Sequence, residues 1–141
     1  MTDNPNLAVL QRAYAGWHES KGGNVAEILD MFDEEIEMHS ALGAGVHEVA
    51  GVHIRREEAA AYFEGLLRDW EMQFFHVDRF IVGECGRDIV MVGRCAWRNK
   101  ATGKVIDTPK IDVHTFNDKG KVIRFQEVYD TLGFAQALGA V

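Results

Sequence analysis

Two side chains that can exchange protons lie two residues apart in segment 110–116 (KIDVHTF). The alternation of this segment is typical of a half-buried β-strand, with Asp112, His114 and Phe116 on one face. Asp112 and His114 would then lie about 6.5–7 Å apart, so that one bound ligand or water molecule contacts both. On a face that looks into water the pair would be a solvated surface feature. In an apolar pocket, burial would disfavour the charged form of Asp112, and the pair could move protons.

Composition limits the classes of function open to the chain. Its 141 residues are enough for one domain with a real core, and 47% of them are hydrophobic. A formal net charge of −7 disfavours nucleic-acid binding, which needs a basic surface. No apolar run approaches the roughly 18 residues of a membrane helix, and the polar N-terminus shows no secretory signal. We therefore expect a cytoplasmic protein with no nucleic-acid or membrane partner.

The cysteines and histidines predict neither a disulfide nor a metal site. Cys85 lies in a turn-like segment and Cys95 in the middle of an expected strand, far from each other in a hairpin. Two free thiols fit a reducing compartment. The six histidines are scattered and no Cys-x-x-Cys motif is present, so we expect no bound metal and no cofactor.

The hydrophobic pattern predicts a helical first half and a stranded second half. We expect helices near residues 7–17, 25–32, 56–68 and 131–138, and strands near residues 35–40, 73–82, 89–98, 105–116 and 122–129. Asn24 would cap the second helix in a capping box with Glu27. Short turns between the last four strands predict an antiparallel meander, and Pro109 within a strand predicts an edge or a bulge. Such an α+β fold would enclose a cavity between sheet and helices, where a ligand site is expected.

The order of these elements resembles the nuclear-transport-factor-like superfamily, which includes ketosteroid isomerases and SnoaL-like polyketide cyclases. The local matches are segments 111–112, 116–117 and 120–122, the helical segment 10–14, and the closing segment 130–139. The resemblance implies a single domain over residues 1–141. Its fold would be a cone-shaped, curved antiparallel sheet wrapped around three N-terminal helices, enclosing an apolar pocket. It also implies a homodimer that binds a small apolar ligand.

The resemblance assigns roles to several residues. Asp112 matches the protonated acid of the ketosteroid isomerase oxyanion hole, and Tyr14 matches the tyrosine beside it. His114 is the nearest candidate for the histidine that SnoaL-like cyclases use together with an Asp. The position of the isomerase general base is occupied by Ser40, whose hydroxyl cannot accept a proton near pH 7 without a partner.

The missing base leaves the proton acceptor open between His114, Glu127 and Asp130. A match to the isomerases turns Glu127 toward the pocket, whereas a match to the cyclases favours Asp130. Asp130 also directly precedes the last expected helix, where an N-cap is wanted. A slip of one residue exchanges the two faces of a strand, so both alternatives stay open.

Two classes of function follow. The first is a cofactor-independent isomerase or cyclase that acts on an apolar, steroid- or polyketide-like carbonyl compound by proton transfer with oxyanion stabilisation. The second is a non-catalytic ligand-binding or dimerisation domain of the same fold. The predicted catalytic residues are Tyr14, Asp112, His114, Glu127 and Asp130. The predicted ligand contacts are Trp17, Ser40, Phe63, Phe116 and Tyr129.

Overall fold

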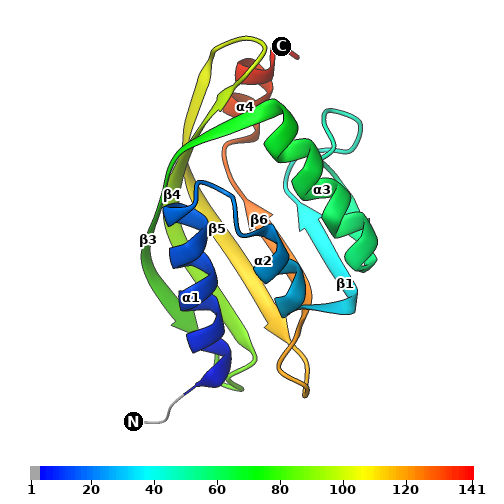
Figure 1. Ribbon diagram of the computed structural model, residues 1–141, viewed down its shortest axis with the longest axis vertical. Coiled ribbons are helices and arrows are strands. Elements are labelled where there is room, and N and C mark those ends of the chain that lie inside the picture. Colours follow the sequence, from blue (N-terminus) through cyan, green and yellow to red (C-terminus); the bar gives the residue numbers. More distant parts are fainter. Residues whose placement is uncertain (1–3) are drawn as a thin grey trace.

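A computed structural model describes residues 4–141 as four helices and six strands (Figure 1). The helices are α1 (Pro5–Glu19), α2 (Val25–Met31), α3 (Arg55–Asp69) and α4 (Thr131–Leu138). The strands are β1 (Phe32–Ser40), β2 (Val52–Ile54), β3 (Trp70–Val82), β4 (Asp88–Asn99), β5 (Val105–Phe116) and β6 (Val122–Val128). In the part of the chain that is described, no helix combines the length and the apolar character needed to cross a bilayer.

The strands form one open sheet in the order β2-β1-β6-β5-β4-β3. Strands β3 to β6 pair antiparallel, as the short turns between them predict. The expectation of a wholly antiparallel sheet is wrong for one pair, because β1 lies parallel to β6. This pair links a strand from the first half of the chain to the last strand. Because no short turn connects the two strands, the sequence does not predict their pairing.

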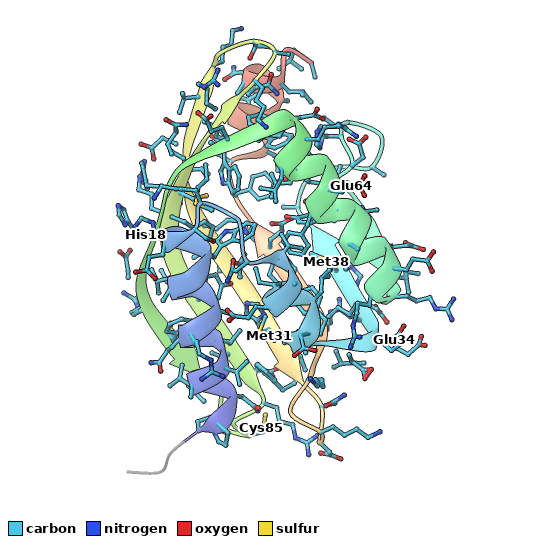
Figure 2. The ribbon with its side chains drawn as sticks, in the orientation of Figure 1. His18, Met31, Glu34, Met38, Glu64 and Cys85 are labelled. Carbon is cyan, nitrogen blue, oxygen red and sulfur yellow. The ribbon has the colours of Figure 1, made fainter. Side chains whose placement is uncertain are left out.

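The three N-terminal helices cover one face of the sheet, and α4 closes one end of it (Figure 1). In β5 the even-numbered residues from Ile106 to Phe116 are buried, which identifies the face turned toward the helices. The hydrophobic core lies between this face and α1, α2 and α3. The sheet and helices are therefore arranged as in the predicted α+β cone (Figure 2).

The N-terminus of α2 differs from the prediction. The side chain of Asn24 makes no capping hydrogen bond. Its Nδ2 instead donates to the carbonyl oxygen of Ala13 and to Oε1 of Glu27, at 3.1 Å each. The bond to Ala13 connects the start of α2 to α1, and the capping box does not form. The helix also ends at Met31, and Phe32 begins β1.

Pro109 lies within β5, where its missing N–H should interrupt a ladder of hydrogen bonds. Pro109 faces Arg94 of β4 on one side. On the other side the pairing with β6 begins only at Ile111, opposite Val128. Since Val128 is the last residue of β6, Pro109 occupies a local edge of a strand that is central elsewhere.

Candidate proton-transfer site

Three ionisable side chains of β5 point toward the helices: Lys110, Asp112 and His114. Each is at most 9% exposed. Across the sheet Asp112 pairs directly with Glu127 of β6, which is 3% exposed. The cross-strand register thus places two buried carboxyl groups next to each other, an arrangement that is costly without a positive charge.

Lys110 supplies that positive charge. Its Nζ contacts Oδ1 of Asp112 and lies 2.9 Å from Oε1 of Glu127. Burial alone would lower the pKa of the ammonium group, but Asp112 and Glu127 outweigh this effect and raise the pKa above its usual value. Lys110 therefore stays charged at neutral pH. The cluster pairs one ammonium group with two carboxyl groups, so with both ionised its net charge is −1.

Tyr14 of α1 reaches the cluster from the opposite side of the core. Its hydroxyl oxygen lies 2.5 Å from Oδ2 of Asp112 and 2.7 Å from Nε2 of His114. The rings of Phe75 and Phe80 pack against the Tyr14 ring, with centroids 5.7 and 5.8 Å away, and hold it in place. Burial, followed by the charge of Asp112, raises the pKa of Tyr14 well above its usual value. Tyr14 is therefore a neutral phenol that joins Asp112 to His114.

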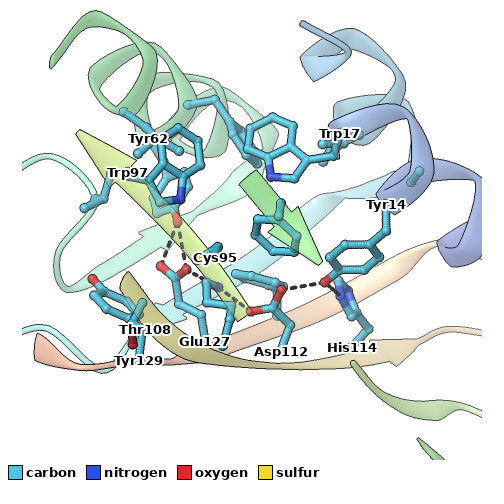
Figure 3. Close-up of a pocket in the computed structure, with 18 of the residues that line it drawn as sticks. Tyr14, Trp17, Tyr62, Cys95, Trp97, Thr108, Asp112, His114, Glu127 and Tyr129 are labelled. Carbon is cyan, nitrogen blue, oxygen red and sulfur yellow. Dashed lines mark hydrogen bonds and ion pairs between the residues drawn. The ribbon is translucent and has the colours of Figure 1, made fainter. Parts of the chain in front are cut away.

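Tyr62 of α3 occupies the corresponding place beside Glu127. Its hydroxyl lies 2.9 and 2.7 Å from the two carboxylate oxygens of Glu127. Burial and the charge of Glu127 raise the pKa of this phenol well above its usual value, so it too is neutral. The six groups form one continuous chain of contacts, and Figure 3 labels all of them except Lys110. Its order is His114, Tyr14, Asp112, Lys110, Glu127, Tyr62.

The hydrogen bonds fix the tautomer of His114. A phenol has one proton, and with Asp112 ionised that proton is donated to the carboxylate, so the Tyr14 oxygen accepts from Nε2–H of His114. The other ring nitrogen, Nδ1, is then an unprotonated acceptor. It is buried and has no hydrogen-bond partner within residues 4–141. Burial lowers the pKa of His114 to about 4, so the ring is neutral at pH 7.

These groups border a cavity of about 100 Å³ between the sheet and the helices (Figure 3). Most of its wall is apolar. Seven of the ten predicted site residues line it: Tyr14, Trp17, Phe63, Asp112, His114, Glu127 and Tyr129. Of the two alternatives Glu127 and Asp130, Glu127 lines the cavity and Asp130 does not.

Three predicted residues lie off the cavity wall, and these placements are corrections. Asp130 accepts a hydrogen bond from the N–H of Gly133 at 2.9 Å and caps α4, which uses its carboxyl group. Ser40 lies at the end of β1, where its hydroxyl lies 3.2 Å from that of Tyr129. Phe116 is 1% exposed, at the far end of β5, and belongs to the core.

Sequence reasoning missed two members of the chain, Lys110 and Tyr62. Lys110 carried a usable signal, because it shares the alternation of Asp112 and His114. Tyr62 lies on the buried side of α3 between Ala59 and Phe63, a pattern that marks core residues and says nothing about the hydroxyl. Cys95 also lines the cavity, and burial raises its pKa to about 11, so it is a neutral thiol.

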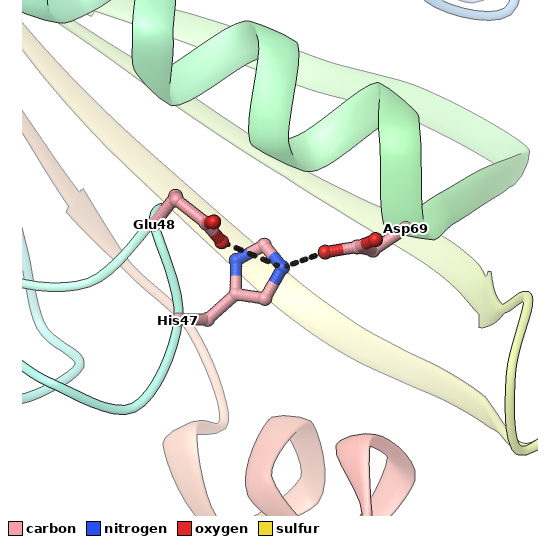
Figure 4. Close-up of side chains that lie close together, drawn as sticks. All are labelled: His47, Glu48 and Asp69. Atoms are coloured by element: carbon pink, nitrogen blue, oxygen red, sulfur yellow. Dashed lines mark hydrogen bonds and ion pairs between the residues drawn. The ribbon is translucent and has the colours of Figure 1, made fainter.

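A second cluster of polar side chains lies at the C-terminal end of α3 (Figure 4). His47 Nε2 lies 2.8 Å from Oδ2 of Asp69 and 3.5 Å from Oε2 of Glu48. Arg68 donates to both carboxylates, at 2.6 Å to Asp69 and 2.8 Å to Glu48. These contacts fasten the loop between β1 and β2 to α3, which places Val49 of that loop on the cavity wall.

Comparison with known proteins agrees with this architecture. In sequence, no curated protein matches the chain. An NTF2-like protein of unknown function from Burkholderia pseudomallei has a TM-score of 0.82 at 18% identity, covering 96% of this chain and 98% of that one. A candidate isomerase from Rhodopseudomonas palustris has a TM-score of 0.75 at 16% identity, covering 99% of both chains.

A candidate SnoaL-like polyketide cyclase from Jannaschia sp. has a TM-score of 0.74 at 18% identity, covering 100% of this chain and 99% of that one. At such identities these similarities establish the fold. The sequence match is more specific, because the SnoaL-like domain matches residues 10–125, most of the chain. The chain therefore belongs to the SnoaL-like domain family.

Proposed function

We propose that this protein is a cofactor-independent acid–base catalyst that moves a proton on a small apolar carbonyl compound. The observation that carries the proposal is the buried Nδ1 of His114, which has no hydrogen-bond partner among residues 4–141 and belongs to a side chain that lines the apolar cavity. A neutral imidazole nitrogen with a free lone pair can accept a proton from a carbon next to a carbonyl group. The candidate isomerase and cyclase of the same fold are consistent with chemistry of this kind.

Lys110 is the group best suited to stabilise the enolate that such a step creates. Its ammonium group has three N–H donors, and two of them contact Asp112 and Glu127. The third is left for a carbonyl oxygen that becomes negative in the transition state, the role of an oxyanion hole. This replaces the role that resemblance gave to Asp112, whose two oxygens already accept from Lys110 and Tyr14.

The cavity volume limits the size of the substrate. A cavity of about 150 Å³ in another protein holds one benzene molecule. The cavity here measures about 100 Å³, so a compound of one small ring or a short chain suits it better than a steroid or a long polyketide. The proposed substrate class is accordingly small, enolisable ketones with an apolar body, for isomerisation or an aldol-type ring closure.

The experiment follows exchange of the α-hydrogens of single-ring β,γ-unsaturated ketones in D₂O by NMR, together with migration of the double bond. Wild-type protein should catalyse exchange, and His114→Gln should lower the rate about 100-fold, the lower end of general acid–base contributions. His76→Gln is the matched control, since His76 is exposed on β3. No exchange above the background rate for any of these ketones would refute the proposal.

One observation favours a binding function without catalysis. Every carboxylate oxygen of Asp112 and Glu127 already accepts a hydrogen bond within the protein, as it would in a structural network. Phenol, a neutral mimic of an enol, separates the two functions. Binding would be followed through Trp17 and Trp97 fluorescence, because both indoles line the cavity. Phenol binding without ketone exchange would identify a binding domain.

A further inference from the structure

We propose that Tyr14 and Asp112 form a proton relay behind His114, so that a proton accepted at Nδ1 of His114 is stored on the carboxyl group of Asp112. The relay deepens the proposed function and rests on it for its biological role. Its physical basis is the short, continuous path from Nε2 of His114 through the Tyr14 oxygen to Oδ2 of Asp112, with steps of 2.7 and 2.5 Å.

The proton positions before the step follow from the hydrogen bonds. Nε2 of His114 carries a proton and donates it to the Tyr14 oxygen, and Tyr14 donates its own proton to Asp112. Nδ1 of His114 has a lone pair and faces no donor among the described residues. Among the described residues, Nδ1 is therefore the vacant acceptor nitrogen at this end of the hydrogen-bonded path.

The step moves three protons by one position each. A C–H proton of the substrate forms a bond to Nδ1 of His114, and the electron pair of the broken C–H bond stays on the substrate as an enolate. The Nε2 proton passes to the oxygen of Tyr14, while the Tyr14 proton passes to Oδ2 of Asp112. His114 and Tyr14 end neutral, and Asp112 ends as a carboxylic acid.

The charge balance favours this end state over a protonated His114. The cluster of Lys110, Asp112 and Glu127 begins with a net charge of −1 and becomes neutral, because Lys110 keeps Glu127 as its counter-ion at 2.9 Å. An imidazolium ion at position 114 would instead be a buried cation, which is costly. Burial lowers the pKa of His114 to about 4, which reflects the same cost.

Among residues 4–141, no other ionisable group intervenes on the path from His114 to Asp112. The titratable groups that act on His114 are Asp112 and Lys110 on its own strand, and the phenol of Tyr14 from α1 lies in contact with it. From β6 the ring of Phe125 packs against the imidazole, with centroids 5.1 Å apart. An apolar neighbour on that side offers no competing proton acceptor, so the path through Tyr14 is the one available.

The relay is tested without substrate by NMR of protein labelled with ¹⁵N and ¹³C. At neutral pH, His114 should be the Nε2–H tautomer. As pH falls within the range where the amide spectrum stays folded, uptake of a proton by the path from His114 through Tyr14 to Asp112 should be coupled to a change of His114 to the Nδ1–H tautomer, without formation of imidazolium. A wild-type Nδ1–H tautomer at neutral pH, or no coupled change across the folded range, would overturn the relay.

Variants separate the relay from a purely structural role of the same residues. Tyr14→Phe removes the oxygen between His114 and Asp112, so the coupled change should disappear and ketone exchange should slow about 100-fold. Tyr129→Phe is the matched control, because Tyr129 lines the cavity outside the chain of contacts and its loss should leave the coupling intact. Coupling that survives in Tyr14→Phe contradicts the proposed path.

The two readouts also distinguish the relay from the proposed function. Coupled titration in a protein that exchanges no ketone supports the relay and refutes the catalytic function. Ketone exchange in a protein whose His114 is the Nδ1–H tautomer at neutral pH supports the catalytic function and refutes the relay.

Discussion

The buried, neutral His114 should make folding stability depend on pH in a way that one substitution removes. The residue has a pKa of 6.5 in an unfolded chain and about 4 in the folded protein. Between these values the unfolded state binds a proton that the folded state does not. The free energy of unfolding is therefore highest above pH 6.5 and falls as pH decreases toward 4.

The size of the effect follows from the two pKa values. Between pH 7 and pH 5, His114 should lower the free energy of unfolding by about 2 kcal/mol, at 1.36 kcal/mol per pKa unit. His114→Gln has no titrating group but keeps an amide that can donate to the Tyr14 oxygen. The pH-dependent loss should therefore be about 2 kcal/mol smaller in the variant than in the wild type.

The assay is urea unfolding followed by tryptophan fluorescence, at pH 7 and at pH 5, for both proteins. The comparison uses the difference between the two pH values within each protein, so the direct cost of the substitution cancels. His76→Gln, which changes an exposed histidine, should behave as the wild type does. Equal pH-dependent losses in wild type and His114→Gln would show that the ring is protonated in the folded state, and the reasoning would fail.

Three further predictions concern the charges and the surface. Lys110→Met leaves two buried carboxyl groups without a counter-ion and should lower the free energy of unfolding by about 3–5 kcal/mol, measured by urea unfolding at pH 7; a loss under about 1 kcal/mol would contradict the buried cluster. Arg68 holds the pKa of Asp69 at about 2, so the small stabilisation from this pair is present above pH 4 and is lost as pH falls toward 2. Asp69→Asn should remove that dependence, worth less than about 1 kcal/mol at this half-buried surface site, and an unchanged acid-unfolding profile would argue against it. The homodimer stays a prediction; light scattering during gel filtration should give twice the mass of 15.8 kDa, and a monomer would refute it.

The alternation of a single strand was sufficient to predict much of the site. Period-two patterning places Asp112 and His114 on one face of β5 whatever the rest of the fold does, and their burial identifies it as the inner face. Lys110 obeys the same pattern, but lysine is so seldom buried that its inward orientation becomes credible only with two carboxyl groups around it. The period-two rule therefore holds for all three residues, but the rarity of buried lysines kept Lys110 out of the predicted site.

Contacts between segments far apart in the sequence could not be predicted from local sequence patterns. Tyr62 meets Glu127 across 65 positions of sequence, and that meeting depends on where α3 crosses the sheet. The choice between Glu127 and Asp130 depended on the β5–β6 register, which a bulge between Thr115 and Phe116 adjusts. The parallel pairing of β1 with β6 likewise has no signal in either strand alone.

Because Asp112 and Glu127 lie opposite each other, the buried charges also affect how β5 and β6 align when the sheet assembles. A slip of two residues between β5 and β6 would keep every apolar side chain on its proper face, so hydrophobicity alone does not prevent it. One such slip would place Glu127 opposite His114 and remove it from Lys110. The misaligned sheet would then contain a buried carboxylate without a cation, at a cost of about 3–5 kcal/mol. The three charges thus discriminate the native alignment from its nearest hydrophobically equivalent alternative.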